Sequence, residues 1–122
     1  MFNHQPVLIV EDNSFLALDL SQAIEELDGR VVGPAGQVSH ALELLDSEDV
    51  AAAIVDCHLT DLDVLMLTHR LAERQVPFII YAETDPPEAV AARHPDVPVL
   101  RKPVHPRMVL DRLLAEMGKV TG

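Results

Sequence analysis

Three acidic residues and one lysine lie directly behind short apolar runs of this 122-residue chain. Glu11 and Asp12 follow the first run, Asp56 follows a central run, and Lys102 lies just beyond the last one. Carboxylates that meet at one place repel one another unless a cation lies among them, and Mg²⁺ is a hard cation that prefers such oxygen ligands. An ammonium group is a suitable partner for a phosphoryl oxygen. These residue types therefore predict an acidic site for Mg²⁺ and a phosphoryl group, if the fold brings them together.

The apolar runs predict five strands that alternate with five helices. We expect strands over residues 7–10, 30–33, 51–55, 78–81 and 97–100. We expect a first helix that is capped by Asn13 or Ser14 and ends at Gly29, and a second that follows an N-cap at Ser39. Three more helices are expected over residues 62–74, 86–92 and 106–117. Runs that are apolar throughout are typical of strands covered on both faces. Strict alternation then predicts the α/β class, with a doubly wound five-stranded parallel sheet.

This architecture brings the polar strand ends together. Right-handed crossovers leave only a few doubly wound topologies. In each of them ligands bind beyond the carboxyl ends of the strands, where the strand order reverses. We therefore expect Glu11, Asp12, Asp56 and Lys102 to converge on one edge of the sheet.

The distribution of charge argues against nucleic acid as a partner. The net charge is −11, because residues 1–61 carry twelve acids against one base while residues 62–122 carry eight of each. Phosphate binding needs a positive surface, and three phenylalanines and one tyrosine offer little for base stacking. We expect a cation, or a protein with a basic face, as the partner.

Cysteine usage and hydropathy argue against export and against a membrane. Cys57 is the only cysteine, which excludes an internal disulfide and a Cys-rich zinc site, and it is expected to be a small buried filler. No apolar run approaches the roughly 18 residues of a membrane span, and the N-terminus lacks a signal-peptide pattern. We expect no membrane association and a cytoplasmic location.

Over essentially its whole length the chain resembles the receiver domain of two-component response regulators. The acidic pair after residues 7–10, Asp56 after residues 53–55, and Lys102-Pro103 carry the resemblance in their order and spacing. The resemblance implies the flavodoxin-like receiver fold with strand order 2-1-3-4-5. Residues 32–35 and the end at residue 122 resemble stand-alone receivers, so residues 1–122 are expected to be a single receiver domain without an output domain.

The resemblance also implies a role for each site residue. Asp56 accepts a phosphoryl group from a phosphohistidine of a sensor histidine kinase or a histidine phosphotransfer protein, and Lys102 pairs with that group. Mg²⁺ is held by Glu11, Asp12, Asp56 and the backbone carbonyl of His58. The Lys102–Pro103 peptide bond is expected to be cis. A homodimer through the last helix and strand is a further expectation.

The expected switch region departs from the family pattern. It comprises Ala82, Glu83, Thr84, Val99 and Pro103. Ala82 stands where the family has a Ser or Thr, and Val99 stands where it has the aromatic switch residue. Thr84 could replace the missing hydroxyl only if its loop is shifted. We therefore expect phosphorylation with an atypical switch.

Two other functions compete with a phospho-accepting receiver. A pseudo-receiver would have the same fold and act as a protein-interaction module without phosphorylation. A Mg²⁺-dependent phosphatase of the haloacid dehalogenase kind needs an Asp-x-Asp motif, whereas the segment from Asp56 to His58 has no second acid. We therefore expect a phosphoacceptor that takes part in its own phosphorylation and dephosphorylation, and not an enzyme with a separate substrate.

Overall fold

A single sheet of five parallel strands forms the centre of the computed structural model, which describes residues 1–121. The strands are β1 (Pro6–Val10), β2 (Arg30–Ala35), β3 (Ala52–Val55), β4 (Phe78–Ala82) and β5 (Val99–Arg101). Their order is β2-β1-β3-β4-β5, and each neighbouring pair is parallel. The predicted fold class and strand order are confirmed.

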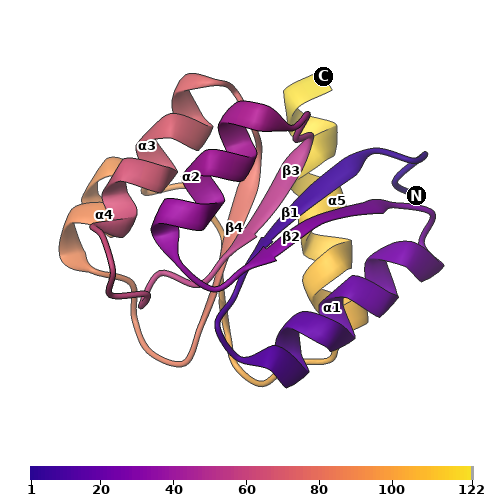
Figure 1. Ribbon diagram of the computed structural model, residues 1–122, viewed down its shortest axis with the longest axis horizontal. Helices are drawn as coiled ribbons and strands as arrows, with labels where there is room; N and C mark the ends of the chain where they lie inside the picture. The colour runs from indigo at the N-terminus through magenta and orange to yellow at the C-terminus, as the bar shows by residue number, and fades with distance from the viewer. Residues whose placement is uncertain (122) are drawn as a thin grey trace.

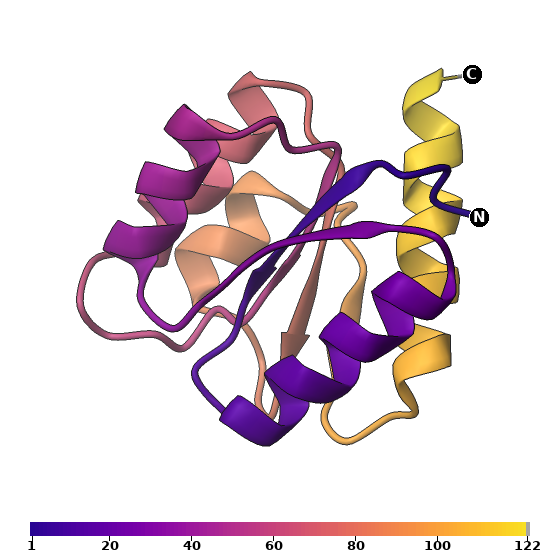
Figure 2. The same ribbon diagram turned by 45° about the vertical axis from the view of Figure 1, so that its right-hand side comes forward.

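Five helices cover the two faces of the sheet (Figure 1). They are α1 (Ser14–Glu26), α2 (Val38–Ser47), α3 (Val64–Glu73), α4 (Glu88–Arg93) and α5 (Pro106–Thr121). The view in Figure 2 separates α1 and α5 on one face from the other three helices on the opposite face. Within residues 1–121, no helix is both long enough and apolar enough to span a membrane.

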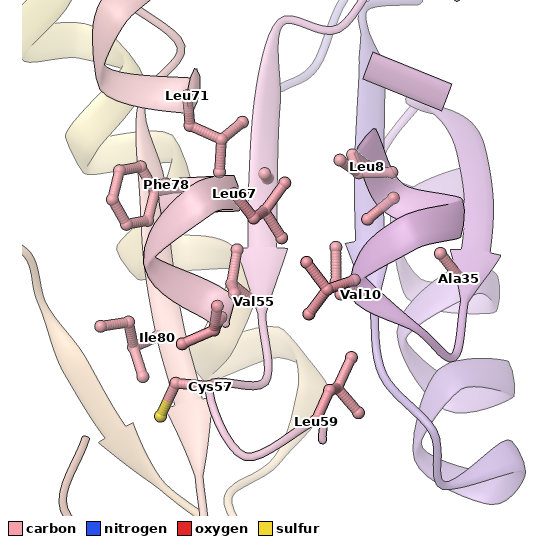
Figure 3. Packing of buried hydrophobic residues seen from close by; sticks show 14 of the residues in the cluster. Leu8, Val10, Ala35, Val55, Cys57, Leu59, Leu67, Leu71, Phe78 and Ile80 are labelled. Atoms are coloured by element: carbon pink, nitrogen blue, oxygen red, sulfur yellow. The ribbon is translucent and has the colours of Figure 1, made fainter. Parts of the chain in front are cut away.

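The sheet separates two apolar cores. Strands β3 and β4 are buried along their whole length, which explains why their sequences are apolar without alternation. Side chains of α2 and α3, Leu67 among them, pack on one face together with Val55 and Ile80 (Figure 3). Side chains of α1 and α5, including Ile24 and Leu110, pack on the other face.

The first helix begins as predicted and ends differently. Its N-cap is Asn13, whose Oδ1 accepts hydrogen bonds from the N–H groups of Phe15 and Leu16 at 3.0 and 3.1 Å. Gly29 does not provide the left-handed residue beyond the helix end, because Asp28 has that conformation, with φ of 65°. Gly29 is required for close packing instead, since a Cβ there would lie 2.7 Å from Cγ2 of Ile24.

The predicted N-cap of the second helix, Ser39, is wrong. Helix α2 begins at Val38, and the N-cap residue Gln37 makes no side-chain hydrogen bond. The cap comes instead from Asp61 in the β3–α3 loop, whose two carboxylate oxygens accept from the N–H groups of Val38 and Ser39 at 2.8 and 3.0 Å. A cap supplied by a later part of the chain leaves no signal in the sequence around Ser39.

The opposite end of α2 is also held by the unit that follows it. The Arg74 guanidinium donates a 2.6 Å hydrogen bond to the Leu45 carbonyl near the end of α2. Arg70 and Arg74 both pair with Asp46, at 2.9 and 2.5 Å. Residues of the β3–α3 unit therefore fix both ends of this helix.

Backbone hydrogen bonds between strand ends position the predicted site residues. The Glu11 N–H donates to the Ala35 carbonyl at 2.8 Å, and the Asp56 N–H donates to the Val10 carbonyl at 2.8 Å. The Lys102 N–H donates to the Ala82 carbonyl at 2.9 Å. The sheet ladder thus continues one residue past the strands, so these three residues share its carboxyl edge.

We expect Leu67→Ala to destabilise the fold by about 3 kcal/mol, because it removes a fully buried side chain from the core between α3 and the sheet. The matched control is its neighbour Met66, which is 51% exposed, and Met66→Ala should change stability by less than about 0.5 kcal/mol. Urea unfolding measures both. Equal losses for the two variants would contradict the assignment of this core.

Candidate functional site

A buried lysine joins two carboxylates at the carboxyl edge of the sheet. Nζ of Lys102, which directly follows β5, lies 2.7 Å from Oε1 of Glu11 and 3.2 Å from Oδ2 of Asp56. The side chains of Lys102, Glu11 and Asp56 are only 7, 2 and 9% exposed. Charges at such depth are tolerated only when they are paired and hydrogen-bonded. The three residues therefore form one electrostatic unit.

The second oxygen of each buried carboxylate is also bonded. Glu11 Oε2 accepts from the Asn13 N–H at 3.1 Å, and Asp56 Oδ1 accepts from the His58 N–H at 3.0 Å. Both bonds come from the loop directly after the strand that carries the acid. They orient the carboxylates and bring the His58 backbone against Asp56.

Asp12 completes the acidic cluster. One carboxylate oxygen from each of Glu11, Asp12 and Asp56 can be chosen so that all three lie within 4.8 Å of one another. Asp12 itself is exposed, so the cluster opens to solvent on its side. Three oxygen donors at this spacing, one of them exposed to solvent, suit a hard divalent cation. Lys102 supplies one positive charge against three carboxylates, so a bound cation would balance the remaining negative charge.

Burial and charge shift the pKa values of Glu11 and Lys102. Burial raises the pKa of Glu11 above its usual range, and this effect exceeds the lowering by Lys102 and the Asn13 N–H. Burial alone would lower the pKa of Lys102, but Glu11 and Asp56 together raise it. The lysine is therefore firmly protonated, and the carboxylates remain undercompensated.

A pocket of about 310 Å³ opens at the cluster. Its lining residues are Asp12, Asn13, Asp56, His58, Glu83, Thr84 and Lys102. The lining brings together the loops after β1, β3, β4 and β5. Most of the predicted site residues thus reach one cavity, whose size admits a small anionic group.

The predicted switch residues divide into two groups. Glu83 and Thr84 line the pocket, and Thr84 Oγ1 lies 2.9 Å from Nε2 of His58. Ala82 is fully buried at the end of β4, whereas Val99 is 41% exposed on β5 and does not line the pocket. The Lys102–Pro103 peptide bond is cis, as the resemblance implied.

Two further contacts were not predicted from the sequence. The Tyr81 hydroxyl donates to the Val104 carbonyl at 3.3 Å and accepts from the Val104 N–H at 3.2 Å. Its ring centroid lies 5.6 Å from Nζ of Lys102. Tyr81 therefore supports the segment that carries the lysine. The second is the contact of Asp61 with the N–H groups at the start of α2. Its only sign in the sequence is an acid five residues after Asp56.

Cys57, between Asp56 and His58, is a packing residue. Its side chain lies in the core on the α2–α3 face (Figure 3). Burial, and next to it the Asp56 charge, raise the pKa of the thiol to about 11. A thiol that stays protonated at neutral pH is a poor nucleophile. The expected role of a buried filler agrees with this environment.

Together, the strand order and the pocket at the carboxyl edge define a receiver-type α/β fold. A CheY-like response regulator receiver domain protein from Methanospirillum hungatei JF-1 has the same fold, with a TM-score of 0.84, 19% identity, and 96% of each chain covered. SdrG from Pseudomonas melonis Fr1, in its BeF3-activated conformation, is 30% identical over 96% of this chain and 98% of its own, with a TM-score of 0.73. No curated protein matches the chain.

The family comparison identifies the chain more specifically. The family described as "Response regulator receiver domain" matches residues 7–114. The chain therefore belongs to the response regulator receiver domains of two-component systems.

We expect Lys102→Ala to tighten Mg²⁺ binding at least about threefold, because the ammonium group lies near the same carboxylates that would hold the cation. Titration calorimetry of the metal-free protein measures the affinity. Lys119→Ala removes an equal charge from an exposed lysine that pairs with half-buried Glu116 on α5, and it should leave the affinity unchanged. A marked loss of affinity in Lys102→Ala would mean that the lysine holds the carboxylates in place.

Proposed function

We propose that this chain is a phospho-accepting receiver in which Asp56 takes a phosphoryl group from a phosphohistidine. Glu11, Asp12, Asp56 and the His58 carbonyl would hold Mg²⁺, and Lys102 would pair with the phosphoryl group. The observation that carries the proposal is the buried contact of Lys102 with Asp56 and Glu11 beside a third carboxylate at a solvent-open pocket.

The proposed step is an in-line phosphoryl transfer. A carboxylate oxygen of Asp56 forms a bond to phosphorus as the bond from phosphorus to the histidine nitrogen breaks, and the electron pair stays on the imidazole. Such transfers depend mainly on positioning and charge neutralisation. The His58 N–H and Lys102 hold the two oxygens of Asp56, which fixes the direction of the carboxylate. Mg²⁺, when bound, would offset the charge on the transferring group.

A relative gives independent support. The structure of SdrG represents a BeF3-activated conformation, and beryllofluoride imitates a phosphoryl group. We infer that this chain, at 30% identity to SdrG, accepts the same mimic at Asp56.

The proposed switch is atypical. The Ala82 methyl group cannot donate a hydrogen bond to a phosphoryl oxygen. The β4–α4 loop already has two other attachments, Thr84 to His58 and Asp85 to Arg101 by an ion pair. We propose that these contacts hold the loop where the family uses a hydroxyl and an aromatic side chain, so phosphorylation changes it less.

A pseudo-receiver is the second candidate. Ala82 and the exposed Val99 favour it, because both lack the family's switch groups. The buried contacts of Lys102 with Glu11 and Asp56 oppose it, because a binding module gains nothing from burying these charges. A phosphatase of the haloacid dehalogenase kind has less support, because His58 occupies the position of the required second acid.

Partner and location are proposed on similar grounds. A histidine kinase or a histidine phosphotransfer protein would supply the phosphoryl group, and the acidic first half of the chain would attract a basic face on it. Exposed Val99 and Met108, on β5 and α5, support a homodimer through this face. A cytoplasmic location is consistent with the unpaired Cys57.

Mass spectrometry after incubation with Mg²⁺ and acetyl phosphate tests the proposal. We expect one phosphate on the wild-type protein and none on Asp56→Asn, because an amide is not a carboxylate nucleophile. Asp49→Asn changes an exposed acid outside the site and should keep the phosphate. A wild type that acquires no phosphate, from acetyl phosphate or from a phosphorylated kinase, would support the pseudo-receiver instead.

We expect Ala82→Thr to enlarge the response of the β4–α4 loop to beryllofluoride, measured as amide NMR shifts over residues 82–105. A hydrogen bond to a charged group contributes about 1.5–3 kcal/mol, a large part of a conformational bias of a few kcal/mol. Thr84→Ala should alter the wild-type response little, because the ion pair of Asp85 with Arg101 still holds the loop. Large wild-type shifts that disappear in Thr84→Ala would show that Thr84 performs the switch.

A further inference from the structure

The β3–α3 loop, residues 56–63, carries Asp56 and His58 and must hold both in place. Asp63 caps α3, the helix that the loop enters, through the Leu65 N–H at 2.9 Å. The Asp56 to His58 bond also stays within the loop. These contacts shape the loop without fixing it against the rest of the molecule.

Asp61 supplies the polar attachment of this loop to α2. Its Oδ1 accepts from the Val38 N–H at 2.8 Å and its Oδ2 from the Ser39 N–H at 3.0 Å. A carboxylate at this place also interacts favourably with the positive end of the helix dipole. Partial desolvation raises the pKa of Asp61. The hydrogen bonds from these N–H groups lower it by more than desolvation raises it, so the pKa lies below its usual range. The charged form of Asp61 therefore makes the contact.

The start of α2 is itself adjacent to the acidic cluster. Gly36, two residues before α2, lies beside Asp12, because a Cβ on it would be in ordinary van der Waals contact, 3.7 Å from Cα of Asp12. The preceding residue, Ala35, accepts from the Glu11 N–H at 2.8 Å. One short segment thus contacts the backbone of both acids of the pair and leads directly into the helix that Asp61 caps.

We propose that Asp61 is a positioning residue of the acidic site: by holding α2 it fixes the loop of Asp56 and His58 relative to Glu11 and Asp12. The inference rests on the proposed function, because the geometry matters only if these groups bind a cation together. Buried Leu59 adds an apolar anchor between Asp56 and Asp61 (Figure 3). Apolar packing of Leu59 does not depend on orientation. The paired hydrogen bonds of Asp61, by contrast, set both the distance and the orientation of the loop relative to α2.

The test compares Asp61→Asn with Asp63→Asn. Both remove one exposed negative charge from the same loop, and each replaces one carboxylate oxygen with an NH₂ group, which cannot accept a hydrogen bond. Asp61→Asn thereby loses one of the two bonds to α2, whereas Asp63→Asn can keep its single bond to the Leu65 N–H through Oδ1. Only Asp61 caps a helix other than the one its own loop enters. Two NMR readouts apply to each purified protein at a temperature where circular dichroism shows it folded: amide hydrogen exchange over residues 57–60 without metal, and the Kd for Mg²⁺ from amide shifts.

We expect Asp61→Asn to speed exchange in residues 57–60 and to weaken Mg²⁺ binding about tenfold, the lower end of the effect of losing an outer-shell partner. Asp63→Asn should stay within about twofold of wild type in Kd. If Asp61→Asn binds Mg²⁺ as tightly as wild type, the positioning role is overturned and the proposed function is not. The same holds if Asp63→Asn loses as much Mg²⁺ affinity as Asp61→Asn. A wild type without Mg²⁺-dependent shifts overturns the proposed function, and the positioning role with it.

Discussion

Burial of like charges at one edge of the sheet is the constraint on which this structure depends. Glu11 and Asp56 end neighbouring strands, and each is less than one-tenth exposed, so their repulsion is poorly screened. Lys102 offsets it from a third strand end, at the cost of its own desolvation. The compensation works only if all three backbones are in register, and the interstrand hydrogen bonds that extend past the strands provide this. The apolar strands are thus a frame for an electrostatic arrangement that would be unfavourable elsewhere.

The undercompensated charge also explains why the site is open on one side. Asp12 is exposed while its neighbour Glu11 is buried, so the cluster has one carboxylate in contact with solvent. An entering cation can exchange water for carboxylate ligands there without disturbing the core. The two loops on the far side of the pocket, after β3 and β4, contact each other through His58 and Thr84. Polar side chains therefore line the pocket at Asp56, whereas the layers beneath it are apolar.

The sequence predicts the sheet and the acidic cluster well because both follow local rules. Residues 52–55 and 78–82 are apolar throughout and form fully buried strands, and the acids directly after strands converge in any parallel sheet. The misassigned Ser39 has a different origin. Its residue type suits an N-cap, but Asp61, 22 residues later, occupies the N–H groups of the first turn. Tyr81 was missed for a related reason, since its hydroxyl partner, Val104, is known only once β4 and the segment after β5 are adjacent.

The capping of α2 has a consequence for the order in which the chain folds. A ten-residue helix is marginal on its own in water, and Gln37 gives this one no cap. The groups that complete its ends, Asp61 at the start and Arg70 and Arg74 at the finish, emerge from the ribosome only after the helix has been synthesised. These contacts at both ends of α2 can therefore form only once the third β/α unit has docked.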